Sequence, residues 1–173
     1  ALPICPELRP QIQINGLDIG LYPIARKSTD IFSALKTAQF LPYAMAARWA
    51  KENQYNDAIV LNTHHRIADT TISNLFIVKE YKIFTPPISE GAINGVMRKY
   101  LIAQLQQDNY PIIEQPLTPE ALLDADEIFL TNVISGIRWV KQFENHTYSG
   151  IVASKLYRDY IVPLWFTDEK PVL

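Results

Sequence analysis

Four short runs with β-strand composition follow one another between residues 57 and 84, and this cluster constrains the fold more than any other feature. Each run is rich in branched or aromatic side chains, and polar residues such as Glu80 separate neighbouring runs. The runs cover residues 57–61, 66–68, 74–78 and 81–84. They predict an antiparallel meander.

Helical patterns lie on both sides of this region. Apolar residues recur at helical spacing over residues 38–53, with Pro42 near the first turn, where its missing N–H does least harm. The same reasoning predicts helices over residues 91–107, after the cap Thr118, and over residues 151–165, ending near Pro163. Further strands are expected around Ile12 and Ile14, near Ile112, and over residues 127–130 and 137–143. The mixture predicts an α+β or α/β fold built on one core.

Composition favours one domain and argues against several classes of partner. The chain has 173 residues, 48% of them hydrophobic, which suffices for one sizeable core, so we expect a single domain over residues 1–173. A net charge of −2 offers no basic stripe for nucleic acid. No run approaches the roughly 18 apolar residues that span a bilayer. A single cysteine, Cys5, and a start unlike a signal peptide predict a cytoplasmic protein.

Lys36 and Asp69 are the candidate reactive residues. Lys36 precedes the first predicted helix, and an amine there becomes a nucleophile if it loses its proton, although most lysines are solvated surface residues. Asp69 follows a β-prone run and precedes a polar loop, so a turn carboxylate is the common alternative. Beside a pyridine-type cofactor, such a carboxylate keeps the ring nitrogen protonated and the ring electron-withdrawing.

Residues 91–98 form a glycine-containing turn that is expected to open a helix. The free backbone N–H groups and the dipole of a helix start favour the binding of an anion, and phosphate is the expected ligand. Glycines at helix starts are also common without any ligand. Arg98 is open to either a phosphate partner or solvent.

Metal and serine-hydrolase sites are not indicated. His64 and His65 have no Cys, Asp or Glu at metal-ligand spacing nearby, so we expect a solvated turn and no metal. Ser33, Ser73 and Ser135 lack the G-x-S-x-G context of a nucleophilic serine.

Read in order, these residues resemble the class IV aminotransferase family, the fold-type IV pyridoxal-phosphate enzymes. The family pattern is a lysine before a helix, an acidic residue five positions before an Asn-x-Phe strand, Thr-Pro before a glycine turn, and Ala-Asp-Glu before a strand ending in a phosphate-binding loop. The matching positions are Lys36, Asp69 with residues 74–76, residues 85–86 with 91–98, and residues 125–127 with 131–133. The resemblance implies an α+β fold, the large domain of the D-amino-acid aminotransferase-like class, with the small N-terminal domain largely absent.

The resemblance also implies roles for individual residues. Lys36 would hold pyridoxal 5'-phosphate covalently and shuttle the proton, and Asp69 would meet the ring nitrogen. The implied phosphate ligands are the backbone N–H groups of Val96 and Met97, with Asn132 and Val133 completing the cradle. The chain departs from the family in three ways: Asp69 stands where Glu is usual, Val133 stands where aminotransferases carry Thr, and the small domain that supplies a phosphate-binding arginine is mostly missing.

Within the family, local motifs favour 4-amino-4-deoxychorismate lyase. Residues 94–98 are similar to the lyase's Asn-Gly-Ile-Met-Arg, and residues 131–134 also look more like the lyase, whereas residues 37–40 do not. The resemblance therefore implies release of pyruvate to give 4-aminobenzoate, a step of folate biosynthesis, from a small-molecule amine substrate. Branched-chain or D-amino-acid aminotransferase activity and a non-catalytic relative without cofactor are the alternatives. Family members are typically homodimers.

Overall fold

One mixed sheet organises the described chain, which comprises residues 15–37 and 41–166 of a computed structural model. In these residues the strand order is β3-β2-β1-β8-β7-β4-β5-β6, with β9 paired to β8. The strands are β1 Leu17–Leu21, β2 Asp57–Leu61, β3 Ile67–Thr70, β4 Asn74–Lys79, β5 Lys82–Thr85, β6 Ile112–Glu114, β7 Glu127–Asn132, β8 Gly136–Phe143 and β9 His146–Thr147. The helical elements are α1 Leu41–Glu52, η1 Ile88–Glu90, α2 Val96–Gln107, α3 Pro119–Leu123, α4 Ile151–Leu156, η2 Tyr157–Ile161 and α5 Val162–Phe166.

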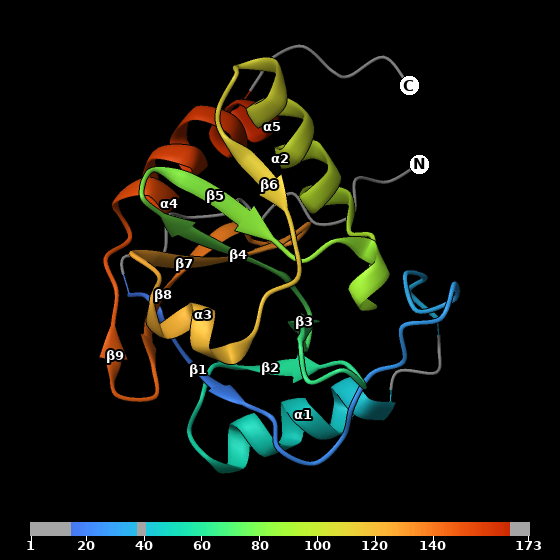
Figure 1. The fold of residues 1–173 in the computed structure, drawn as a ribbon. Helices are drawn as coiled ribbons and strands as arrows, with labels where there is room; N and C mark the ends of the chain where they lie inside the picture. The colour runs from blue at the N-terminus through green and yellow to red at the C-terminus, as the bar shows by residue number, and fades with distance from the viewer. Residues whose placement is uncertain (1–14, 38–40, 167–173) are drawn as a thin grey trace, which may run out of the picture.

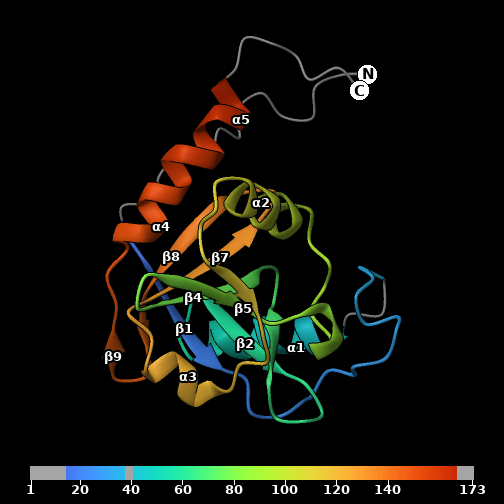
Figure 2. The same ribbon diagram turned by 45° about the horizontal axis from the view of Figure 1, so that its top comes forward.

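Helices cover different parts of the sheet (Figure 1). Helix α1 packs against β2 through a small cluster that includes Tyr43, Ala46 and Val60. Helices α2 and α4 pack on β4 and β7 through a second cluster around Phe76 and Phe129. Figure 2 shows α4 and α5 running on as one rod beside the strands. Helix α1 therefore covers the sheet at β2, whereas α2 and α4 cover it around β4, β7 and β8.

Another apolar cluster joins β1, β2, β3, β4, β7 and β8 to α3. Its fully buried members include Ile19, Ile59, Ile67, Leu75 and Ile128. These side chains come from strands far apart in the order of the sheet, so the sheet curls around them. Burial of branched and aliphatic side chains from many strands in one cluster is the main source of stability for such a fold.

The predicted meander is wrong at its middle. Strands β2 and β3 are antiparallel neighbours, as are β4 and β5, but β3 and β4 do not pair. Strand β4 has β5 on one side and β7 on the other, so no edge of β4 is left for β3. The polar segment after β3 thus carries the chain from one part of the sheet to another.

Helix α2 starts later than predicted, and the last helix contains a π-helical turn. Helix α2 begins at Val96, because Gly91 has φ +87° and ends the preceding η1 turn, and Gly95 is extended. The last helical segment, predicted over residues 151–165, runs from Ile151 to Phe166 and passes Pro163 after the π-helical turn η2. A proline clashes with the carbonyl four residues earlier, and the wider turn, in which the Val162 N–H donates to the Tyr157 carbonyl, accommodates it.

Other predicted elements are confirmed. Helix α3 starts at Pro119 directly after Thr118, and the strands predicted near Ile112 and over residues 127–130 and 137–143 are β6, β7 and β8. The strand expected around Ile12 and Ile14 lies outside the described residues, and β1 follows it. No helix within residues 15–37 and 41–166 combines the length and apolarity needed to cross a membrane.

Candidate functional site

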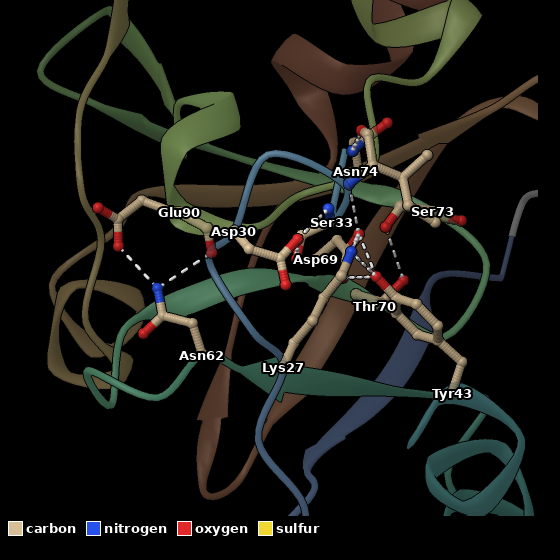
Figure 3. A network of polar contacts seen from close by, with 11 residues as sticks. Lys27, Asp30, Ser33, Tyr43, Asn62, Asp69, Thr70, Ser73, Asn74 and Glu90 are labelled. Carbon is tan, nitrogen blue, oxygen red and sulfur yellow. Dashed lines mark hydrogen bonds and ion pairs between the residues drawn. The ribbon is translucent and has the colours of Figure 1, made fainter. Parts of the chain in front are cut away.

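Asp69 is a buried carboxylate at the centre of a polar network (Figure 3). It lies within strand β3 and is 2% exposed, so the alternative of a turn carboxylate is wrong. The Tyr43 hydroxyl lies 2.8 Å from both carboxylate oxygens, and the Ile93 N–H donates to Oδ2 at 2.9 Å. The ammonium of Lys27 lies 3.6 Å from the same Oδ2. Four separate segments of the chain thus meet at this carboxylate.

Burial dominates the electrostatics of this network. It raises the pKa of the Asp69 carboxyl to about 6, against the lowering effects of the Lys27 charge and the hydrogen bonds to the carboxyl. Burial lowers the pKa of Lys27, while the nearby carboxylate raises it. The Tyr43 pKa rises well above its usual range for the same reason and because of the adjacent carboxylate. Tyr43 therefore acts as a hydrogen-bond donor at ordinary pH.

Sequence reasoning did not find Lys27 or Tyr43. Tyr43 lies on the buried face of α1 with Ala46 and Ala50, and a buried tyrosine needs a partner for its hydroxyl, which is a weak signal for a polar contact. The backbone of Lys27 is held beside the end of β2: its N–H donates to the Leu61 carbonyl at 2.8 Å. No local pattern around Lys27 indicates burial.

The short loop before α2 connects Asp69 with the Lys36 segment. Ile93 donates its N–H to Asp69, and the next residue, Asn94, donates its N–H to the Ala34 carbonyl at 3.0 Å. Lys36 follows Ala34 by two positions, and its side chain is exposed. The structure thus brings the segment that carries Lys36 and the buried Asp69 to two consecutive residues of one loop.

Ser73 and Asn74 tie together the two elements that were predicted to bind a phosphate. The Asn74 side-chain amide donates to the Ile93 carbonyl at 2.7 Å, just before α2. The Asn132 amide, at the end of β7, donates to the Ser73 hydroxyl at 2.9 Å. The start of α2 and the turn between β7 and β8 are therefore held near each other by adjacent residues.

The start of α2 has the features of an anion site. Its N-cap is Gly95, which provides no side-chain cap, and the first N–H groups of a helix have no carbonyl partner within the helix. Val96 is 65% exposed and Met97 is buried. In the β7–β8 turn, which Ser73 and Asn74 hold near the start of α2, Val133 follows Asn132 and is 51% exposed. The Asn132 side-chain oxygen accepts the N–H groups of Ile134 and Ser135, which fixes this turn.

Arg98 takes neither of the two roles that the sequence left open. It is buried, it donates to the Pro86 carbonyl at 2.9 Å, and it forms an ion pair with Glu114. Arg98 therefore fastens α2 to the segments after β5 and in β6. The turn of His64 and His65 is exposed, as expected. Within residues 15–37 and 41–166 there is no group of three or more His, Cys, Asp or Glu side chains able to hold a metal ion.

Comparison with known proteins decides the family. The family model described as amino-transferase class IV matches residues 3–143. The chain belongs to the class IV aminotransferase family. This finding confirms the family predicted from the ordered motifs, and with it a family of pyridoxal-phosphate enzymes and the α+β fold class.

Relatives of two kinds resemble this class IV chain. Aminodeoxychorismate lyase of Vibrio harveyi is 37% identical over 125 residues, which cover 72% of this chain and 46% of the relative. A probable branched-chain-amino-acid aminotransferase of Thermotoga maritima is 30% identical over 92 residues, covering 53% of this chain and 34% of the relative. The chain spans about half, or less, of the length of these curated relatives.

Solved structures agree on the fold. A structure described as a 4-amino-4-deoxychorismate lyase from Legionella pneumophila matches with a TM-score of 0.80 and 28% identity, over 90% of this chain and 58% of that one. An aminotransferase from Brucella abortus, solved bound to pyridoxal phosphate, matches with a TM-score of 0.76 and 26% identity, over 88% and 56%. The matched region is a little more than half of each of these class IV structures.

Replacing Gly95 with alanine is expected to loosen the start of α2 in this class IV domain. A Cβ at this position would lie 2.2 Å from the side-chain oxygen of Asn74, whose amide forms the tether to Ile93. We expect a loss of about 1–3 kcal/mol in the free energy of unfolding, measured by urea titration. Asn94→Ala, at an exposed neighbouring side chain, is the control and should change the free energy by less than about 0.5 kcal/mol. Equal stability of Gly95→Ala and wild type would contradict the packing argument.

Proposed function

We propose that this chain binds pyridoxal 5'-phosphate between β3 and the start of α2, and that the complete protein is a pyridoxal-phosphate enzyme resembling 4-amino-4-deoxychorismate lyase. The observation that carries the proposal is the meeting of three parts at one loop. Asp69 contacts Ile93, the Lys36 segment contacts Asn94, and the open helix start follows at Gly95. A carboxylate, an amine and an anion site are what this cofactor requires.

The residues of the site fit the cofactor. An ionised carboxylate offers about four acceptor sites. In the described part of the chain, the Tyr43 hydroxyl and the Ile93 N–H donate to Asp69, and the Lys27 ammonium lies 3.6 Å from its Oδ2. Capacity therefore remains on Asp69 for a protonated ring nitrogen. Its shorter side chain, compared with Glu, is compensated in our proposal by its fixed position on β3.

Ring geometry favours Lys36 over Lys27 as the linking amine. The pyridine ring carries its nitrogen and its aldehyde-bearing carbon on opposite sides, so the carboxylate and the linking amine must be separated by the width of the ring. The Lys27 ammonium lies 3.6 Å from Asp69, which leaves no space for a ring between them. Among the described residues no such contact of Lys36 with Asp69 is observed, and the segment that carries Lys36 lies at the same loop, where the Asn94 N–H donates to the Ala34 carbonyl. We assign the linkage to Lys36.

The remaining roles follow from position. When bound, pyridoxal phosphate supplies an electron-withdrawing ring that stabilises negative charge on the carbon next to the substrate amine. In our proposal the freed amine of Lys36 moves the proton at that carbon, and Asp69 keeps the ring oriented. The N–H groups of Val96 and Met97 bind the phosphate, and Asn132 and Val133 close the cradle.

The lyase reaction is favoured over amino-group transfer. The motif Asn-Gly-Val-Met-Arg at residues 94–98 resembles the lyase, and a lyase relative is 37% identical over 72% of the chain. Relatives described as branched-chain aminotransferases keep the alternative open. We also propose that residues 1–173 form one domain and that the protein forms a homodimer.

A product assay tests the reaction. With added pyridoxal phosphate, we expect this protein to release pyruvate and 4-aminobenzoate from 4-amino-4-deoxychorismate without any keto acid. Amino-group transfer from a branched-chain or D-amino acid to 2-oxoglutarate, without pyruvate release, would replace the lyase by an aminotransferase. If the protein binds no cofactor in an absorbance titration, the proposal of a pyridoxal-phosphate enzyme fails and the non-catalytic relative remains.

A further inference from the structure

Lys27 is a nearly buried lysine next to the carboxylate of the proposed site. Its side chain is 10% exposed, its ammonium lies 3.6 Å from Asp69 Oδ2, and it also hydrogen-bonds to the Tyr43 hydroxyl. The backbone holds this residue on both sides, because the Lys27 N–H donates to Leu61 and the Lys27 carbonyl accepts the N–H of Thr63. These two bonds fix the backbone of Lys27, and its side chain points toward Asp69 and Tyr43 (Figure 3).

The other charged groups around this pair have their own partners. Asp30 lies in the turn that follows Lys27, and its carboxylate accepts hydrogen bonds from Ser28, Phe32 and Ser33. Glu90, beside the end of β2, accepts two hydrogen bonds from the Arg66 guanidinium. Among the described residues, the positive charge paired with Asp69 is that of Lys27.

A buried carboxylate needs such a charge to remain ionised. Removing a carboxylate from water favours its neutral form, and an opposite charge within about 4–6 Å favours the charged form. At Asp69 burial is nearly complete, and its other donors are the neutral Tyr43 hydroxyl and the Ile93 N–H. Hydrogen bonds from neutral donors stabilise the ionised form of a carboxylate less than a full positive charge does. The ionised state of Asp69 therefore depends on Lys27.

We propose that Lys27 is a positioning residue that keeps Asp69 ionised for the ring nitrogen of the cofactor. This inference rests on the proposed function for the identity of the ring, but the link between Lys27 and Asp69 is a property of the protein alone. It assigns a function to a residue that lies outside the motifs shared with the family. It also explains how an aspartate that is 2% exposed can remain ionised and accept a hydrogen bond from the protonated ring nitrogen.

Carbon-13 NMR of aspartate side chains in the cofactor-free protein tests the link directly. The variant Asp69→Asn identifies the Asp69 signal. In wild type we expect its carboxyl to titrate near pH 6. In Lys27→Met the midpoint should move upward by about one unit or more, because the neutralising charge is gone. Lys27→Arg keeps the charge and should restore the wild-type midpoint, which a purely structural role for the side chain does not predict.

Two outcomes of these titrations would contradict the role of Lys27. An Asp69 midpoint that is the same in wild type and Lys27→Met would overturn the proposal. If Lys27→Met does not fold, as judged by circular dichroism, the wild-type protein decides: the Lys27 ε-carbon signal must respond in the same pH step as the Asp69 carboxyl. A Lys27 signal that does not respond in that step also overturns it.

A second measurement separates this inference from the proposed function. Fluorescence titration with pyridoxal phosphate at a series of pH values should show weaker binding below the Asp69 midpoint, and Lys27→Met should move that transition upward together with the NMR midpoint. Protein that shows the Lys27-dependent Asp69 titration but binds no cofactor would refute the function and leave the link intact. Cofactor binding with no Lys27-dependent shift would refute the link and leave the function intact.

Discussion

Lys36→Ala is expected to abolish the covalent attachment of pyridoxal phosphate to this protein. In our assignment the Lys36 amine both links the cofactor and moves the proton at the reacting carbon, and an alanine does neither. Borohydride reduction of wild type should add one cofactor mass to the peptide that contains Lys36, whereas Lys36→Ala should gain none. Pyruvate release should fall by roughly a thousandfold or more, since both roles are lost together.

The control for this experiment is Lys99→Ala. Lys99 is an exposed lysine in the first turns of α2, close in sequence to the proposed phosphate site, and its removal should leave the reduced adduct unchanged. An adduct of equal yield in Lys36→Ala would contradict the assignment, and its mapping to another lysine would name the true linking residue. Loss of the adduct in Lys99→Ala as well would point to a disturbed phosphate site.

The order of motifs predicted more of this protein than any single residue did. Lys36, Asp69 and the glycine turn indicated a family, and the match over residues 3–143 confirms it. The helix and strand types also followed from local patterns, because spacing of apolar residues reports which face is buried. The start of α2 at Val96 was misplaced, since it depends on a glycine in the left-handed region, and the π-helical turn of the last helix was not predicted.

The contacts that build the site could not be read from the sequence. Lys27 and Tyr43 meet Asp69 across 42 and 26 positions of the chain, and the side-chain tether from Asn132 to Ser73 spans 59. Such contacts are set by the strand order, in which β3 and β4 are separated although they are consecutive. A pattern within one segment holds no information about a partner that only the sheet brings near.

Glu127 shows how a family motif can serve folding. It belongs to the Ala-Asp-Glu segment that precedes the predicted phosphate loop, but it lies at the start of β7, buried, and points to the start of α4. Its carboxylate accepts hydrogen bonds from the Ser149 hydroxyl at 2.7 Å and from the N–H groups of Ile151, Val152 and Ala153 at 2.9 to 3.1 Å. The N-cap residue of α4, Gly150, offers no side-chain cap. Glu127 therefore caps α4 from a distant strand.

Glu127→Ala is expected to have the largest effect on stability of the substitutions considered for this protein. It would leave the Ser149 hydroxyl and the N–H groups of Ile151, Val152 and Ala153, most of them partly buried, without an acceptor, and each loss of a cap or of a charged hydrogen bond costs about 1–2 kcal/mol. We expect the free energy of unfolding, measured by urea titration, to fall by about 3 kcal/mol. Glu127→Gln keeps one acceptor oxygen and should lose roughly half as much. Asp126→Ala is the matched control, since Asp126 accepts the Glu80 N–H at an exposed turn and its loss should cost about 1 kcal/mol or less. If Glu127→Ala were no less stable than Asp126→Ala, the start of α4 would have to be held by packing alone, and the capping role of Glu127 would be wrong.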